Sequence, residues 1–176
     1  VLSILLSFEV LILLVLSIAV LAPGSGAPVS AVSFAPSTVV SGNFGVAIMF
    51  AFVSFLGFES AAIYSEEAAD GARTVTRALI AAVLFIAVFY ALSMWSVVNA
   101  FGADQVVAAA GENPGTLVFR AFATYTAAPF VLIAEALMVT SALAATIALH
   151  NAAARYVFAL AREGMLPARF GALHPQ

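Results

Sequence analysis

"GFESAAIYSEEAADGARTVTRA", residues 57–78, is the stretch in which the chain first departs from a long uncharged run. Residues 10–58 contain no charged side chain, and Glu59 then stands inside the same apolar run, two positions after Gly57. A charge at bilayer depth is costly and generally faces a bundle interior or a water-filled cavity. The fold therefore has to explain why a carboxylate and a glycine occur together at this point.

The composition favours lipid as the solvent of this chain. Hydrophobic residues make up 64% of the sequence and charged residues 9%, whereas a soluble domain carries about 25% charged residues. A helix needs roughly 20 mostly apolar residues to span a bilayer. Such stretches occupy about 1–22, 44–65, 78–101 and 128–150. We therefore predict an all-α integral membrane protein with four transmembrane helices.

The ends and the charge of the chain add further expectations. The first stretch lacks a basic leading region and carries Glu9, which favours a span over a secretory signal. The chain begins at Val1 within an apolar run, so we expect a fragment of a larger protein. It has no Cys, no Lys and a net charge of -3, which gives no indication of disulfides, thiolate metal sites or nucleic-acid binding. No nucleophile–base pair or phosphate loop indicates an enzyme, and no cofactor is expected.

The segments between the spans are polar or rich in helix breakers. Residues 23–42 contain many Gly, Pro and Ser and are predicted to form a loop without a helical period, after which Asn43 caps the second span. Residues 103–127 are predicted to form a longer loop, in which 103–110 and 115–124 are expected as short helices divided by Asn113–Gly115. After the fourth span, Gly164 suits the left-handed cap of a helix that Pro167 soon follows.

The arginines predict the orientation in the membrane. Arg73 and Arg77 lie in the polar loop 66–77. Arg155, Arg162 and Arg169 lie after the fourth span. An even number of spans separates the two groups, so they share a side, and only Arg120 falls opposite. The positive-inside rule places the 66–77 loop and the tail in the cytoplasm and the 23–42 and 103–127 loops outside.

Three carboxylates lie within spans, namely Glu9, Glu59 and Glu135. For Glu9 and Glu135, which lie nearer the ends of their spans, a structural hydrogen-bonding role competes with a functional one. The hydroxyls of Thr140, Ser141 and Thr146 are expected to bond to carbonyls of their own helix.

Glu59 differs because Gly57 precedes it near the middle of its span. A glycine weakens a helix interior by roughly 1 kcal/mol relative to alanine. One interpretation is a discontinuous helix that lines a cavity, with the carbonyls of its outer half attracting a cation or ammonium group. The other is an intact helix in which Glu59 bonds to a neighbour. His150 and Asn151 form a second polar point on the fourth span, and a packing role and a proton-carrying role are both open for His150. Trp95, on the third span, needs no functional explanation.

Two separated motifs resemble those of amino acid permeases in the amino acid–polyamine–organocation (APC) superfamily. "FAFVSFLGFESAAIYSEEAADGARTVTRA" is similar to the sixth transmembrane segment and its following loop, and "HNAAARYVFALAREGMLPARFGALHP" is similar to the end of the eighth. The resemblance covers essentially the whole chain. It implies that residues 1–22, 44–69, 78–101 and 128–157 are segments five to eight of a two-repeat inverted fold whose sixth helix is broken. The 103–127 loop would then be an extracellular lid, and residues 158–176 a cytoplasmic tail.

The resemblance also implies a substrate site. Backbone carbonyls near Val53 and Leu56 would bind the substrate ammonium group, Gly57 would mark the unwound stretch, and Phe58 would lie near the site. Glu59 would couple gating to occupancy, and His150 would fall close to the pocket. The resemblance leaves proton coupling, sodium coupling and exchange open.

The expected function is secondary active transport of amino acids or related amines across the cell membrane by alternating access. Its partners would be the small-molecule substrate, the bilayer and the remaining helices of the transporter. The alternative is a non-transporting membrane assembly partner or a truncated remnant.

Overall fold

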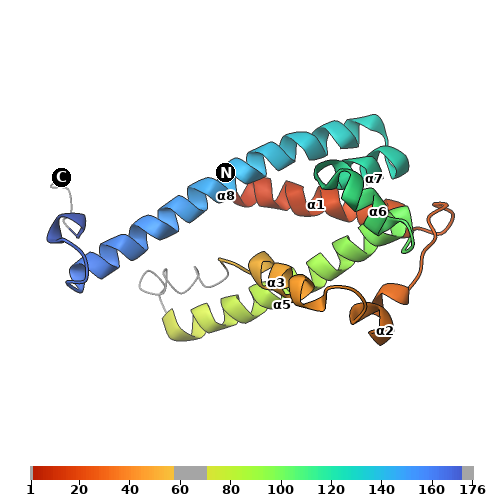
Figure 1. Cartoon of the computed structure of the whole chain (residues 1–176). Helices are drawn as coiled ribbons and strands as arrows, with labels where there is room; N and C mark the ends of the chain where they lie inside the picture. Colours follow the sequence, from red (N-terminus) through yellow and green to blue (C-terminus); the bar gives the residue numbers. More distant parts are fainter. Residues whose placement is uncertain (1, 58–70, 172–176) are drawn as a thin grey trace. The chain divides into compact units, whose positions relative to one another are not determined.

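The structure, a computed structural model, describes residues 2–57 and 71–171. Within these ranges every regular element is a helix (Figure 1). The long helices are α1 (Leu2–Leu21), α5 (Gly71–Phe101) and α8 (Ala128–Arg162). The shorter elements are η1 (Val32–Phe34), α2 (Pro36–Val39), α3 (Phe44–Ser54), α6 (Val106–Glu112), η3 (Pro114–Thr116), α7 (Leu117–Tyr125) and η4 (Ala168–Phe170).

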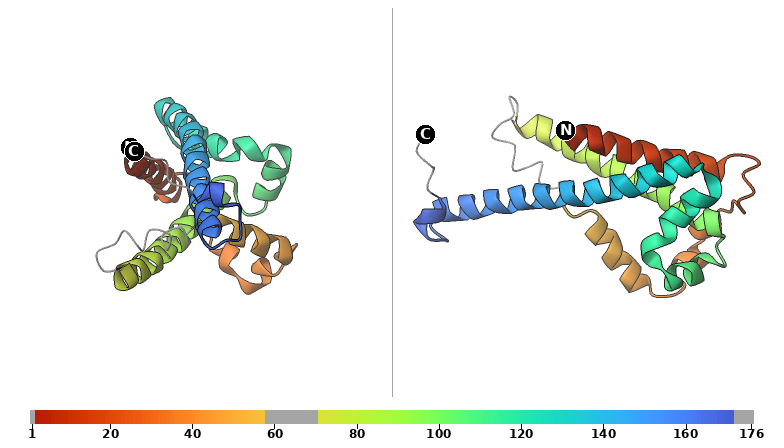
Figure 2. Two further views of the ribbon diagram at one scale, coloured as in Figure 1. Left: turned by 90° about the vertical axis from the view of Figure 1, so that its left-hand side faces the viewer. Right: turned by 90° about the horizontal axis from the view of Figure 1, so that it is seen from above.

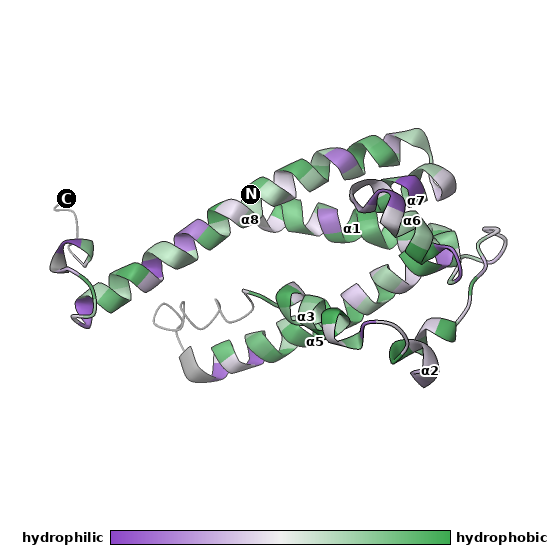
Figure 3. Ribbon diagram, in the orientation of Figure 1, coloured by the Kyte–Doolittle hydropathy of each residue, from purple (hydrophilic) through white to green (hydrophobic). Residues whose placement is uncertain are grey.

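Three of the described helices are long and apolar enough to cross a bilayer by length and composition: Ser3–Leu21, Arg73–Phe101 and Ala128–Arg162. Most of the ribbon of α1, α3 and α5 carries the colour of hydrophobic residues (Figure 3). Large side chains such as Leu11, Phe52 and Val88 are exposed on these helices. Lipid or further protein must cover such surface, so the prediction of an all-helical membrane protein is supported by three of its four spans.

The second predicted span is described only in its outer part. α3 has 11 residues, which is about 16 Å of helix by the rise per residue and about half of a ~30 Å hydrocarbon core. A turn at residues 55–57 follows α3. The remainder of the predicted span, residues 58–69, lies outside the described residues. The fourth crossing and the inverted repeat therefore stay predictions.

The chain divides into two compact units, residues 1–55 with 83–141 and residues 56–82 with 142–176. The core of the first unit lies where α1 meets α7 and the beginning of α8. Ile12, Leu16 and Val20 are spaced four apart, so they form one stripe on α1. They pack with Phe122 of α7, which is 1% exposed, and with Ala121 and Ala134. Figure 2 shows the α6–α7 hairpin beside the C-terminal part of α1.

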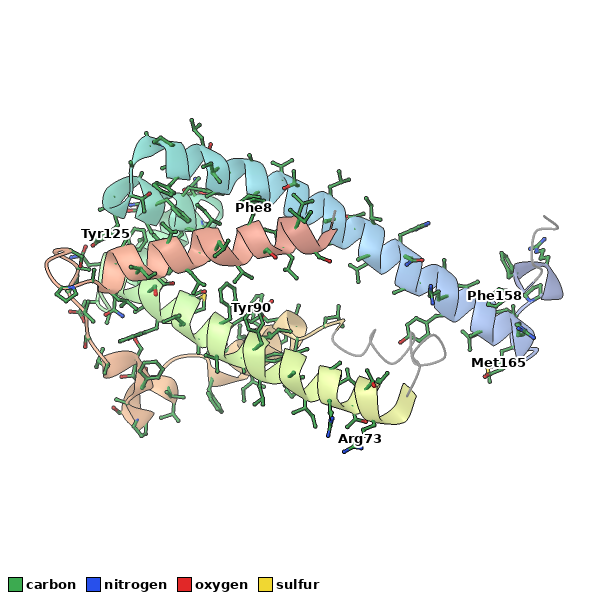
Figure 4. All side chains as sticks on the ribbon, turned by 180° about the vertical axis from the view of Figure 1, so that it is seen from behind. Phe8, Arg73, Tyr90, Tyr125, Phe158 and Met165 are labelled. Carbon is green, nitrogen blue, oxygen red and sulfur yellow. The ribbon has the colours of Figure 1, made fainter. Side chains whose placement is uncertain are left out.

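The α6–α7 hairpin is attached to the C-terminal end of α5. The hydroxyl of Tyr125 (labelled in Figure 4) donates a 3.0 Å hydrogen bond to the carbonyl of Ala100. Arg120 lies 5.4 Å from the ring centroid of Phe101 and 3.6 Å from a carboxylate oxygen of Glu112. The hairpin thus has the two short helices that the sequence predicted. Its Arg120 contacts Phe101 of α5 and Glu112 of α6.

A second loop lies against the same end of α5. Residues 25–34, called the strap below, include Ser30, whose backbone groups are held by Trp95 and Asn99. The prediction that residues 23–42 have no helical structure was wrong in part, because η1 and α2 form within them. Pro36 stands at the first position of α2, where its missing N–H has no helical partner to lose.

Two local predictions at helix ends were right. The side chain of Asn43 caps α3, accepting a 3.3 Å hydrogen bond from the Val46 amide. Gly164, at φ +79°, ends α8, and the Met165 amide returns to the Leu160 carbonyl at 3.0 Å. α5 begins at Gly71, within the stretch predicted as a polar loop, because no helix breaker separates residues 72–78 from the span. α8 likewise continues to Arg162, beyond the predicted residue 157.

Candidate functional site

The C-terminal end of α3 lies close to where one of the two interpretations of the sequence places a helix break. α3 ends at Ser54 inside the apolar run, and a turn at 55–57 follows. Gly57 has φ +96°, a conformation that side-chain-bearing L-residues rarely adopt, although a Cβ would have open space there. Backbone conformation therefore favours glycine at this position. At the end of α3 the Phe55 amide donates to the Phe52 and Val53 carbonyls, and the negative end of the helix dipole makes this a place for a cationic group.

The structure places part of the predicted site. Val53 lies on the last turn of α3 and Leu56 in the turn that follows, and both side chains are exposed. His150 is exposed on α8. Phe58 and Glu59 lie outside the described residues. Val53 belongs to the first compact unit, whereas Leu56, Gly57 and His150 belong to the second, so their common site is a proposal.

A cavity of about 600 Å³ borders the C-terminal half of α3 within the first unit. Its lining includes Ser54 of α3, Phe55 directly after it, Ser17 of α1, and Tyr90 and Ser93 of α5. The ring of Phe55 meets that of Tyr90 (labelled in Figure 4) edge-on, with centroids 6.2 Å apart. The volume lies within the range of about 300–1,000 Å³ that small-molecule sites occupy.

Hydroxyl groups supply most of the polarity of this cavity. Ser17 donates to the Leu13 carbonyl at 2.9 Å, and Ser54 to the Phe50 carbonyl at 2.8 Å. The Ser93 Oγ atom is buried and has no hydrogen-bond partner in the part of the chain that the structure describes. The walls are otherwise apolar, which suits an uncharged hydrocarbon group better than a second charge.

An intramembrane carboxylate has a partner on another helix. The Ser141 hydroxyl of α8 donates a 3.0 Å hydrogen bond to Oε2 of Glu9 on α1. Both residues line a cavity of about 340 Å³ whose other walls include Pro114, Phe119 and Met138. The bond agrees with the hydrogen-bonding interpretation of Glu9, and Glu135 is exposed on α8.

The prediction that Ser141 bonds to its own helix was therefore wrong, whereas the same prediction was right for its neighbours. Thr140 donates to the Leu137 carbonyl at 3.0 Å, and Thr146 to the Ala142 carbonyl at 2.8 Å. Ser141 differs because it faces α1 at the level of a carboxylate, a stronger acceptor than a carbonyl that is already bonded. Spacing within α8 carries no signal for this contact, since its partner is 132 residues away.

The described residues give no sign of a metal centre. No group of three or more His, Cys, Asp or Glu side chains in the two described ranges is placed to hold a metal ion.

Three long apolar helices, two of which are joined by a hydrogen bond between a hydroxyl and a carboxylate, indicate an integral, multi-pass membrane protein. A family model described as amino acid permease matches residues 1–176. The chain belongs to the amino acid permease family of the APC superfamily, which is a family of transporters and not of enzymes. No curated protein and no solved structure matches the chain. The assignment of its helices to segments five to eight stays a prediction.

Proposed function

We propose that these residues form part of a secondary transporter that moves amino acids or related amines across the cell (plasma or inner) membrane by alternating access. Membership of the permease family supports transport of amino acids in general. The observation that carries the finer proposal is the end of α3 at Ser54, followed by Gly57 at φ +96°, about half a bilayer from the start of the helix. Transporters bind small charged solutes at such helix interruptions.

The substrate ammonium group would bind backbone carbonyls near Val53 and Leu56. The negative end of the α3 dipole lies there, and an ammonium group has three N–H donors to offer. Phe58 would border the substrate, and His150 would fall close to the pocket. The 600 Å³ cavity beside Ser54 and Phe55 offers apolar room near the same helix end.

Glu59 would link substrate occupancy to closure, with a proton or a sodium ion as the coupling partner. A lone carboxylate in an apolar span is costly unless it has a partner or loses its charge, so its protonation or pairing can favour one conformation over another. The predicted second half of the broken helix, the inverted repeat and the outward position of the α6–α7 hairpin belong to the same proposal.

An uptake assay tests this proposal. The intact protein, reconstituted into proteoliposomes, is offered each proteinogenic amino acid and a set of simple amines in radiolabelled form. We expect saturable uptake of at least one of them above the level of protein-free liposomes. No uptake of any compound, with or without a proton or sodium gradient, would favour the non-transporting assembly partner or remnant instead.

A further inference from the structure

The strap is held to α5 through both backbone polar groups of one residue, Ser30. The Ser30 amide donates a 2.6 Å hydrogen bond to Oδ1 of Asn99, and the Ser30 carbonyl accepts a 2.8 Å bond from Nε1 of Trp95. Trp95 and Asn99 are four apart on α5, so they stand on one face of the helix. This spacing lets the two side chains bond to both backbone polar groups of Ser30, as a paired β-strand would.

The two gripping side chains are themselves fixed. Asn99 is 2% exposed, and its Nδ2 donates to the Trp95 carbonyl at 2.7 Å, which orients Oδ1 toward the strap. The indole ring of Trp95 contacts the ring of Phe34 with centroids 5.8 Å apart. Loss of the bond to Ser30 would leave Oδ1 of the buried Asn99 unsatisfied, which costs about 1–3 kcal/mol.

The contact continues to the end of α5. A Cβ at Gly102 would stand 3.3 Å from Cγ of Pro28, so the strap's proline packs on a residue without a side chain. Gly102 also has φ +83°, which glycine accepts and other residues rarely do. The strap therefore runs antiparallel to the last two turns of α5 and contacts them through Pro28, Ser30 and Phe34.

α3 has little packing of its own. None of its residues is buried, although it is the helix on which the candidate substrate site stands. Its inner end meets α5 through Phe55 and Tyr90. Its outer end is joined to the strap by residues 35–43, part of which is coiled into α2 and thus spans less distance than an extended chain would.

We propose that Trp95 and Asn99 are positioning residues for α3, holding the strap so that the outer end of α3 keeps its place beside α5. The pair was missed from the sequence, which gave Trp95 no function beyond its place in the span. The role rests on the proposed transport function, since a mispositioned α3 reduces the fraction of protein ready to bind substrate. A smaller competent fraction raises the apparent dissociation constant in proportion.

The two hydrogen bonds from Trp95 and Asn99 to Ser30 are called the clamp below. Hydrogen exchange measured by mass spectrometry tests the clamp without any substrate. In the intact wild-type protein, the peptide covering residues 29–31 should exchange more slowly than an unprotected amide. Trp95→Phe removes the indole donor but keeps a ring against Phe34, and Asn99→Ala removes the acceptor. Each should speed exchange of that peptide about fivefold or more. Ser96→Ala is the matched control, because Ser96 is equally buried and bonds only to the Leu92 carbonyl of its own helix.

Uptake by the same variants tests the positioning role. We expect Trp95→Phe and Asn99→Ala to raise the KM for the transported radiolabelled amino acid about threefold or more, with Ser96→Ala unchanged. Fast exchange of residues 29–31 in the wild-type protein would overturn the clamp. Faster exchange in the variants with an unchanged KM would overturn the positioning role while leaving transport intact. If Asn99→Ala does not fold, Trp95→Phe alone tests both the clamp and the positioning role.

Absence of wild-type uptake refutes the proposed function and the positioning role with it, whereas the exchange result still decides the clamp.

Discussion

Ser141 of α8 donates a 3.0 Å hydrogen bond to the carboxylate of Glu9, which stands on α1, 132 residues away in the sequence. Helix association in lipid relies on van der Waals packing and interhelical hydrogen bonds rather than on the hydrophobic effect. In the described residues this is the polar side-chain contact that joins α1 to α8 directly, beside the apolar packing of Ile12, Leu16 and Ala134.

Removing Ser141 or Glu9 should each destabilise the protein, and the effect of both changes together should differ from the sum of the two single effects. A double-mutant cycle with Ser141→Ala and Glu9→Leu should give a coupling free energy of about 1 kcal/mol, as interhelical hydrogen bonds in membranes do. Thermal unfolding in detergent is the measurement. Ser7→Ala is the control, because the Ser7 hydroxyl bonds to the Ser3 carbonyl of its own helix at 2.9 Å. Strictly additive effects of the two changes would show that the bond contributes nothing.

A side chain at Gly57 should impair transport through the backbone alone. Gly57→Ala meets no atom within 4 Å but forces an L-residue into a left-handed conformation, which costs about 1–2 kcal/mol. We expect several-fold slower uptake of the transported amino acid. Gly45→Ala, in the first turn of α3, should leave uptake near wild type, because Gly45 has no left-handed φ and an added Cβ would meet only Oδ1 of Asn43, at an ordinary 3.8 Å. Equal uptake by both variants contradicts the proposed role of the turn.

Replacing the carboxylate of Glu59 should alter coupling. Glu59→Gln keeps the size of the side chain and removes its charge, so we expect reduced uptake or a weaker dependence of uptake on pH. Uptake measured across a pH series in proteoliposomes provides the comparison. Glu135→Gln removes an exposed carboxylate from α8 and should leave the profile unchanged. A Glu59→Gln profile identical to wild type would refute coupling through this residue.

The α6–α7 hairpin should loosen when its bond to α5 is removed. Tyr125→Phe deletes the hydroxyl that donates to the Ala100 carbonyl, at a cost of about 1 kcal/mol. Hydrogen exchange in α7 should rise about fivefold if local opening governs it. Tyr156→Phe, on an exposed position of α8, serves as the control. Unchanged exchange in α7 would mean that Arg120 and the apolar core hold the hairpin without Tyr125.

Local sequence signals predicted the helix ends and the spans because their causes are local. Asn43 caps the helix that begins one residue later, and Gly164 adopts the left-handed conformation that ends α8. The length and apolarity of α1, α5 and α8 likewise follow from contiguous residues. The start of α5 at Gly71 was missed since polar side chains on an exposed helical turn look the same as those of a loop.

Contacts between distant segments could not be predicted in the same way. Nothing in the sequence near Ser141 distinguishes it from Thr140 or Thr146, which bond to their own helix. Trp95 and Asn99 form an i, i+4 pair, but only the folded chain brings Ser30 against them. Both cases depend on how the helices pack, which a pattern on one helix does not record.

The central claim is that the inner end of α3 binds the transported amino acid, and protection of a cysteine there tests it most directly. This chain contains no native Cys, so Leu56→Cys in a background without other cysteines reports on one position. We predict that the amino acid found by the uptake assay slows maleimide labelling of Leu56→Cys at concentrations near its KM. Labelling of Val107→Cys, on the exposed face of α6, should not change. Labelling of Leu56→Cys at the same rate with and without that amino acid, in a variant that still transports it, would contradict the account.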